Sequence, residues 1–188
     1  MEHQEIEVRF LEIDKENLVA KLNHLGAIDH GEELLDERII FDKDLNWQKA
    51  AKFLRLRTKG GKTTLTYKDR QSPHEPSAHG TEEIEFEVSD PNLALALLDR
   101  LGFEPFRYQQ KKRHSFSLGS VTVDIDTWPK IPTYVELEGD TEDDIKEAAK
   151  TLDLDWEAVE FRDPKLVIEQ VYNIPVGKMK WFTFDRFE

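Results

Sequence analysis

EIEVRF at residues 5–10 is matched in mid-chain by EIEFEV at residues 83–88. Both stretches alternate charged and apolar side chains with a period of two, as a strand does when one of its faces is apolar. An apolar helical stripe follows each stretch and ends at a glycine, Gly26 in the first case and Gly102 in the second. Three more strand-like runs follow each glycine. The chain therefore predicts two β-α-β-β-β halves that arose by internal duplication.

The length and the repeat together favour a single folding unit. The chain has 188 residues, enough for one sizeable core, and each half needs strands of the other half to close a sheet. We therefore expect one domain over residues 1–188, with halves at about 1–70 and 81–140 and a helical extension at 141–188. The polar, proline-containing stretch 71–81 is the expected hinge between the halves.

Composition narrows the class of partner. The formal net charge is -13, and long-range repulsion disfavours binding to duplex nucleic acid. The chain has no cysteine, which excludes disulfides and thiolate metal sites. No apolar run approaches the roughly 20 residues of a membrane span, and Met1 leads directly into charged residues without a secretory signal. We expect a cytoplasmic protein with a small-molecule partner and neither a nucleic-acid nor a membrane partner; the oligomeric state is left open.

Local patterns place the elements. Period-two runs predict eight strands, at 5–10, 34–41, 53–57, 63–68, 83–88, 108–118, 120–127 and 133–138. Gly60-Gly61 is typical of a tight hairpin turn. Periodic apolar residues and capping signals predict helices at 13–25, from Asp90-Pro91 onward, at 141–152 and at 163–172.

One face of most predicted strands is ionic. Arg55 and Arg57 alternate with Leu54 and Leu56, and carboxylates replace the cations on the first, fifth, seventh and eighth runs. Two interpretations are open at this point. The ionic face is either the solvated side of an antiparallel sheet or the inner face of a barrel, for which about eight strands suffice.

An inward ionic face has a specific chemistry. Several Arg and Lys side chains neutralise a polyphosphate, Arg through a planar fork and Lys as a compact charge. Asp and Glu clusters without Cys or paired His favour hard divalent cations, Mg²⁺ or Mn²⁺. Cations alone would bind a polyphosphate, whereas carboxylates that hold a metal would also support a reaction on it.

The Glu5-x-Glu7-x-Arg9 opening resembles the E-x-E-x-K signature of the CYTH superfamily, the triphosphate tunnel metalloenzymes. That superfamily includes class IV adenylyl cyclases, thiamine triphosphatases and inorganic triphosphatases. The resemblance continues in order over residues 4–140. It comprises a paired-arginine strand, a lysine strand, a later basic strand, an aspartate and a closing E-x-E, at Leu54-Arg55-Leu56-Arg57, Leu65-Thr66-Tyr67-Lys68, Lys111-Lys112-Arg113, Asp126 and Glu136-Leu137-Glu138.

The resemblance implies an α+β fold, an eight-stranded antiparallel β-barrel or tunnel with helices packed outside. A triphosphate lies inside, and Mg²⁺ or Mn²⁺ bridges it to carboxylates. The implied metal ligands are Glu5, Glu7, Asp126, Glu136 and Glu138. The implied phosphate-binding residues are Arg9, Arg55, Arg57, Lys68, Lys111 and Arg113. Glu85 and Asp126 are the candidate catalytic residues, Glu83 is a weaker candidate metal ligand, and Arg38 is expected at the tunnel rim.

Two departures from the family pattern bear on the reaction. Arg9 replaces the signature Lys and cannot act as a base, because an arginine does not lose its proton in a protein. The four residues before Glu5 leave no room for the His-Phe segment of the bacterial cyclase branch. We therefore expect a metal-dependent triphosphatase acting on tripolyphosphate or a triphosphate-bearing metabolite. The alternatives are a class IV-type adenylyl cyclase that makes cyclic AMP from ATP and a non-catalytic polyphosphate- or nucleotide-binding protein.

Overall fold

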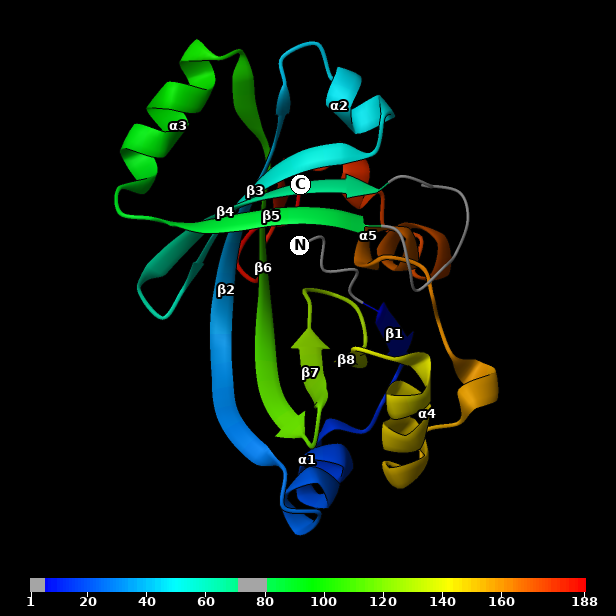
Figure 1. Ribbon diagram of the computed structural model, residues 1–188. Helices are drawn as coiled ribbons and strands as arrows, with labels where there is room; N and C mark the ends of the chain where they lie inside the picture. The colour runs from blue at the N-terminus through cyan, green and yellow to red at the C-terminus, as the bar shows by residue number, and fades with distance from the viewer. Residues whose placement is uncertain (1–5, 71–80) are drawn as a thin grey trace.

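Eight antiparallel strands form one curled sheet in the computed structural model, which describes residues 6–70 and 81–188 (Figure 1). The strands are β1 (Ile6–Phe10), β2 (Ile28–Asp42), β3 (Lys52–Lys59), β4 (Lys62–Arg70), β5 (Thr81–Val88), β6 (Phe103–Leu118), β7 (Val121–Thr127) and β8 (Tyr134–Gly139). A short ninth strand, β9 (Trp181–Phe182), pairs in parallel with β6. The predicted α+β antiparallel architecture is confirmed. Glu5 and the expected hinge at 71–81, except Thr81 at the start of β5, lie outside the described residues.

The two halves of the repeat exchange their first strands. The strand order is β1-β8-β7-β6-β2-β3-β4-β5, so β1 joins the three later strands of the second half and β5 joins those of the first. The long strands β2 and β6 pair in the middle and connect the halves. Each half therefore completes its part of the sheet with a strand from the other, as the sequence predicted.

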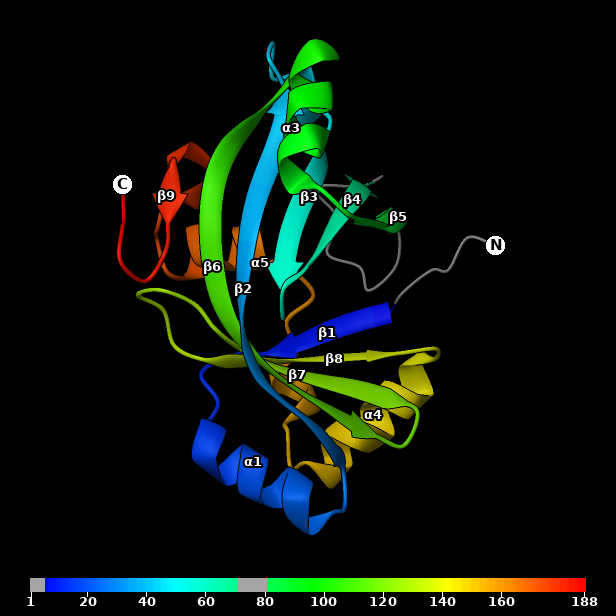
Figure 2. The same cartoon turned by 90° about the vertical axis from the view of Figure 1, so that its left-hand side faces the viewer.

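The sheet curls into a half-barrel. Figure 2 shows β2 and β6 as long curved strands, with β3, β4 and β5 turned toward the viewer's right above and β1, β7 and β8 below. Within the described residues β1 and β5 are not paired with each other, so the concave side stays open between them. A bulge at Ile39–Ile40, opposite Pro105 and Arg107, helps to bend the central pair.

The helices are α1 (Lys15–His24), α2 (Asn46–Lys49), α3 (Pro91–Arg100), α4 (Glu142–Thr151) and α5 (Pro164–Leu166), with 3₁₀ or π turns at η1 (Trp156–Ala158), η2 (Val167–Val171) and η3 (Val176–Lys178). α1, α3 and α4 pack on the convex side of the sheet, whereas α5, η2 and η3 contribute residues to the concave side. Side chains of Asp14, Asp90 and Thr141 cap three of the helices, as their sequence signals require. The helix expected at 163–172 forms as a single α turn followed by a π turn.

Apolar side chains form cores between the convex face of the sheet and the helices packed on it. Val8, Val123 and Leu137 belong to a core that α1 and α4 cover, and Ile40, Leu56 and Leu98 form a smaller one under α3. Each fully buried Val, Leu or Phe contributes about 1.5–3 kcal/mol relative to exposure. Burial of these residues directs the alternate, ionic positions of the same strands toward the concave side.

The turn between β3 and β4 is the tight hairpin turn that the sequence predicted. Gly60 and Gly61 join β3 to β4 with φ values of 55° and 80°, a conformation that favours glycine at both positions.

No helix in the described part of the chain has the length and apolarity needed to cross a membrane.

Candidate functional site

Several ionic residues of the concave face are buried. Arg9 is 1% exposed, Lys111 4% and Asp126 0%. Ionic side chains become this deeply buried only when they are paired with one another or with a ligand. The solvated-face interpretation is therefore wrong for this part of the sheet, and the inward-face interpretation is correct.

Two ionic walls face each other across the concave side. The first, called here the β6–β1 wall, carries residues from β6, β7, β8 and β1: Lys111, Arg113, Asp124, Asp126, Glu136, Glu138, Glu7 and Arg9. The second, the β2–β5 wall, carries residues from β2, β3, β4 and β5: Glu37, Arg55, Arg57, Thr66, Lys68, Glu83 and Glu85.

Arg113 is the centre of the β6–β1 wall. Its Nε and NH2 groups donate to both oxygens of Asp126, at 2.7 and 2.6 Å, and NH2 also donates to Glu136 at 3.0 Å. Its NH1 group pairs with Asp124. Burial opposes the charge of Arg113, but the carboxylates of Asp126, Glu136 and Asp124 together outweigh it and raise the pKa of the guanidinium well above its usual value. Lys111 Nζ lies 2.6 Å from Asp126, so both Asp126 oxygens are held by cations.

Arg9 joins the sheet to the C-terminal segment. Its NH2 group lies 2.6 Å from an oxygen of Glu7 and 2.6 Å from one of Glu136, and NH1 donates to the carbonyl of Arg162 at 3.1 Å. The backbone of Arg9 also pairs with that of Glu160. The predicted phosphate-binding residue Arg9 therefore holds two of the predicted metal ligands. Despite burial, Arg9 and Arg113 keep the pKa of Glu136 well below its usual value.

The carboxylates of the β6–β1 wall have the chemistry of a site for a hard cation. Glu7 and Glu138 lie directly opposite each other on β1 and β8, an arrangement that repels unless a cation lies between them. The buried Oδ1 atom of Asp124 has no hydrogen-bond partner, and burial raises the pKa of this carboxyl despite Arg113. Among residues 6–70 and 81–188, however, no three carboxylate or imidazole groups converge on one point. Glu7, Asp124, Glu136 and Glu138 offer oxygen atoms of the kind that Mg²⁺ and Mn²⁺ prefer.

Arg55 is the centre of the β2–β5 wall. Its guanidinium lies 3.5 Å from Glu83, 3.6 Å from Glu85 and 3.9 Å from Glu37. Burial and the neighbouring Arg57 lower the pKa of Arg55, the opposite of the effect at Arg113. Lys68 pairs with Glu83. The predicted catalytic carboxylate Glu85 is exposed and accepts a hydrogen bond of 2.5 Å from Thr66.

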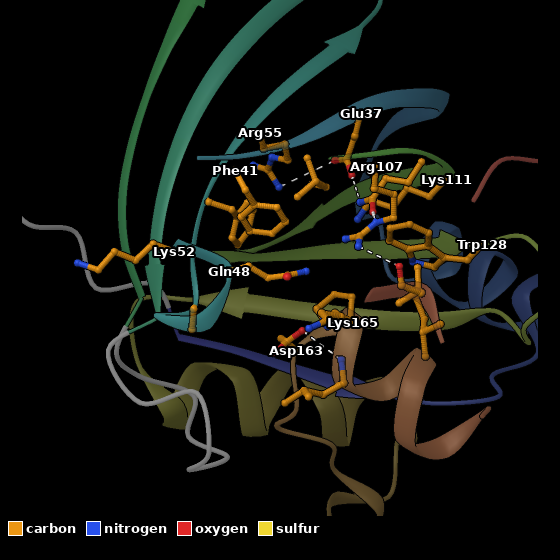
Figure 3. A pocket seen from close by; sticks show the side chains of 18 of the residues that line it. Glu37, Phe41, Gln48, Lys52, Arg55, Arg107, Lys111, Trp128, Asp163 and Lys165 are labelled. Atoms are coloured by element: carbon orange, nitrogen blue, oxygen red, sulfur yellow. Dashed lines mark hydrogen bonds and ion pairs between the residues drawn. The ribbon is translucent and has the colours of Figure 1, made fainter. Parts of the chain in front are cut away.

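A cavity of about 350 Å³ lies between the central strands and the C-terminal segment (Figure 3). Seven cationic side chains line it, Lys49, Lys52, Arg55, Arg57, Arg107, Lys111 and Lys165. Among the described residues, Glu37 and Asp163 are the carboxylates of the lining, so cations outnumber carboxylates there by seven to two. Lys52, Lys111 and Lys165 also pair with carboxylates beside the lining, which are Asp69, Asp126 and Glu169, so the excess of positive charge is smaller than this count and centres on Arg55, Arg57 and Arg107. A concave, low-dielectric surface with this surplus attracts a compact polyanion.

The family assignment rests on the sequence together with this geometry. The family model of the CYTH domain matches residues 3–162. This chain belongs to the CYTH family. A comparison with curated proteins found no significant match.

Solved structures share the fold of this CYTH domain. The PH1012 protein of Pyrococcus horikoshii is 29% identical, with a TM-score of 0.69 over 85% of this chain and 96% of its own. A proposed adenylate cyclase from Vibrio parahaemolyticus is 15% identical, with a TM-score of 0.75 over 90% and 99% of the two chains. HpAC1 from Hippeastrum, a proposed adenylyl cyclase with a dominant triphosphatase activity, is 15% identical, with a TM-score of 0.64 over 92% and 96%. The last two show likeness of fold.

The structure separates the predicted phosphate-binding residues into two groups. Arg55, Arg57 and Lys111 line the cavity of the CYTH domain. Arg9, Lys68 and Arg113 form ion pairs with carboxylates of the walls and are not part of that lining. Arg38 does not lie at the rim as expected. Its guanidinium lies 5.6 Å from the ring of Tyr108, on the opposite side of β2 from Glu37.

Sequence reasoning missed several lining residues. Arg107 lies two and four positions before Gln109 and Lys111 on β6, so extending the period of that strand backward would have found it. Glu37 shares its face of β2 with Leu35 and Ile39, so its charge breaks an apolar pattern and signals a buried partner. Lys165, from the C-terminal segment, carries no such signal.

Proposed function

We propose that this CYTH domain is a divalent-metal-dependent triphosphatase that hydrolyses tripolyphosphate or a triphosphate-bearing metabolite bound on the concave side of the half-barrel. The observation that carries the proposal is the cationic surplus of the 350 Å³ cavity. A bound triphosphate would offset the repulsion between these cations, so the folded protein gains stability when the ligand binds. Membership of the CYTH family and the triphosphatase activity of HpAC1 support the same assignment.

Binding would fall mainly to three cations of the cavity. Arg55 and Arg57 project from alternate positions of β3 and offer planar donor groups to phosphoryl oxygens. Lys111 approaches from β6, held by Asp126 on one side and by the ring of Trp128, 5.3 Å away, on another. Cations fixed in this way stabilise the charge that develops on a leaving phosphoryl group without reorganising.

The metal would be held by the carboxylate edge of the β6–β1 wall. Glu7, Glu136 and Glu138, with Glu5 from outside the described residues, supply the hard oxygen ligands that Mg²⁺ and Mn²⁺ prefer. When bound, such an ion neutralises phosphate charge and activates a water molecule. Asp126 can join the ligands only if Lys111 or Arg113 releases one of its oxygens.

Glu85 is the proposed general base. Its carboxylate is exposed at the open side of the half-barrel, lies 3.6 Å from Arg55, and is oriented by the hydroxyl of Thr66. A carboxylate in this position can accept a proton from an attacking water molecule, which Arg9 cannot do.

Phosphate release from tripolyphosphate, ATP and thiamine triphosphate, with Mg²⁺ or Mn²⁺ and with EDTA, tests the proposal. We expect metal-dependent orthophosphate release from at least one of them. Cyclic AMP and pyrophosphate from ATP would instead identify a cyclase. Tight binding without turnover would identify a binding protein.

A matched pair of variants tests the base. Glu85→Gln should lower kcat by a factor of about 10²–10⁴, the usual contribution of general-base catalysis, with little change in KM. Glu82→Gln, on the opposite face of the same strand, should retain activity. Equal activity of the two variants would exclude Glu85 as the base.

A further inference from the structure

Glu37 places a carboxylate inside the cationic cavity. It lies on β2, and its register partners are Arg57 on β3 and Gln109 on β6. Its side chain is 3% exposed, and Figure 3 shows it among the cavity residues near Arg55 and Lys111. A buried anion at the centre of a cation cradle needs an explanation, since it competes for the same donors as a phosphate.

Hydrogen bonds fix both oxygens of Glu37. Oε1 accepts from Arg57 Nε at 2.6 Å, and Oε2 accepts from Gln109 Nε2 at 2.5 Å. Gln109 Oε1 in turn accepts from Arg107 Nε at 2.8 Å, and Arg107 NH1 donates to the carbonyl of Val176 at 3.0 Å. This chain of hydrogen bonds runs from β3 to the C-terminal segment. The carboxylate therefore cannot turn away when a ligand arrives.

The same contact orients Arg57. Within the described part of the chain, Glu37 is the partner of the Arg57 guanidinium, and it uses only Nε. The two terminal amino groups are left for a ligand in the cavity that Arg57 lines. Although burial opposes it, the cations Arg57, Arg55 and Lys111 hold the pKa of Glu37 well below its usual value, so the carboxylate is charged at neutral pH.

We infer that Glu37 is a specificity-determining residue of the proposed triphosphate site. It orients Arg57 and places a fixed negative charge on the cavity floor, which disfavours ligands in proportion to their own charge. This inference rests on the proposed function. Because the repulsion from a fixed charge grows with the number of phosphoryl groups, Glu37 penalises longer polyphosphate chains more than shorter ones.

The test is the affinity of Glu37→Gln for tripolyphosphate and tetrapolyphosphate, measured by calorimetry without divalent metal. We expect Glu37→Gln to bind tripolyphosphate about tenfold more tightly than the wild type does. Its gain in affinity for tetrapolyphosphate should be larger. A role confined to positioning Arg57 predicts the opposite sign, since a misplaced guanidinium weakens both. Glu32→Gln, which makes the same change at an exposed position of β2 paired with Lys15, should bind as the wild type does.

A second variant tests whether a change in affinity comes from misfolding of Glu37→Gln. The amide introduced at position 37 opposes the donor Nε2 of Gln109, so the single variant loses one buried hydrogen bond. Glu37→Gln combined with Gln109→Glu restores every hydrogen bond and moves the carboxylate from Arg57 to Arg107. This double variant keeps one carboxylate in the cavity, because position 109 also lines it. We expect it to unfold near the wild-type temperature and to bind tripolyphosphate about as tightly as the wild type does, so that a gain seen with Glu37→Gln alone reports the loss of the cavity charge.

The outcomes separate the two proposals. If the wild type binds tripolyphosphate and the folded Glu37→Gln variant binds it equally or more weakly, the inference about Glu37 is wrong and the proposed function stands. If the wild type binds tripolyphosphate neither without metal nor in the presence of Ca²⁺, the proposed function fails and the inference fails with it. A rise in affinity that is larger for tetrapolyphosphate supports both.

Discussion

The two walls of the half-barrel share one sequence pattern but pair their charges differently. In the β6–β1 wall, Arg113 contacts three carboxylates, and its pKa is raised above the usual value. In the β2–β5 wall, burial and the neighbouring Arg57 lower the pKa of Arg55. Surplus carboxylates make the first wall suited to a metal cation. The second wall holds three cations and three carboxylates, and cations outnumber carboxylates only in the cavity, where Arg55 and Arg57 lie with Arg107 and Lys111 of β6. The same alternation of charged and apolar residues therefore gives two different charge distributions, set by which partners the register brings opposite.

The largest expected effect is on the β6–β1 wall. Arg113→Ala leaves Asp124, Asp126 and Glu136 buried with fewer cations, and breaking a buried ion pair typically costs about 3–5 kcal/mol. For a chain of this size each kcal/mol lowers the melting temperature by about 2–4 °C. Thermal unfolding measures the loss. Arg186→Ala removes an exposed pair with Glu188 and a contact with the ring of Trp181, and should lower stability by no more than about 1–2 kcal/mol. Equal losses would show that Arg113 is not the centre of its wall.

The second largest effect is expected on the stabilisation by a bound triphosphate, which should depend on Arg57 of the β2–β5 wall. A triphosphate at a hundredfold excess over its Kd should stabilise the wild type by about 2.7 kcal/mol. Arg57→Ala should remove most of that gain while lowering the stability of the free protein less than Arg113→Ala does. Melting curves with tripolyphosphate and Ca²⁺ provide the measurement. Arg38→Ala, on the outer face of the sheet, should keep the full ligand-induced rise. A normal rise in Arg57→Ala would remove Arg57 from the site.

A smaller effect is expected on the free energy of unfolding at acidic pH. The pKa of Glu37 is lower in the folded protein than its usual value of 4.5, so its carboxylate stabilises the fold above pH 4.5, and this contribution is lost as the pH falls below that value. Each unit of depression corresponds to about 1.4 kcal/mol. Glu37→Gln should therefore lose less stability than the wild type between about pH 5 and pH 3. Urea unfolding across that range measures it, and parallel curves would contradict the prediction.

The smallest change in stability is expected at the metal edge. Glu138→Gln relieves repulsion from Glu7 across β1 and β8, so the free energy of unfolding should change by less than about 1 kcal/mol. Mn²⁺ affinity and metal-dependent turnover should both fall. Calorimetric titration with Mn²⁺ tests this, with the exposed Glu104→Gln as control. Unchanged Mn²⁺ affinity in Glu138→Gln would place the metal elsewhere.

Local physics made much of the fold predictable. The duplicated alternation predicted the strand faces, and the capping residues Asp90 and Thr141 and the turn at Gly60-Gly61 lie where their conformational preferences require. The extra length of β2, Ile28–Asp42, was not predicted, because its first residues carry no clean alternation and are held by pairing with β6. The division of the helix after Asp163 into an α turn and a π turn was likewise not predicted, and Ile168 of the π turn belongs to a buried cluster with Trp128 and Tyr134.

The sequence by itself determined the residue types and the face each occupies, because side-chain direction in a strand depends only on the parity of the position. Only the tertiary structure decided which charges meet. Arg9 lies against Glu136 and the carbonyl of Arg162, and Glu37 lies between Arg57 and Gln109. These partners come from strands and segments far apart in the chain, and strand order, register and curvature select them. The parity of their positions predicts that Arg9 and Arg57 lie on the same ionic face of the sheet. The register of the folded sheet places Arg9 among carboxylates and Arg57 in the lining of the cavity.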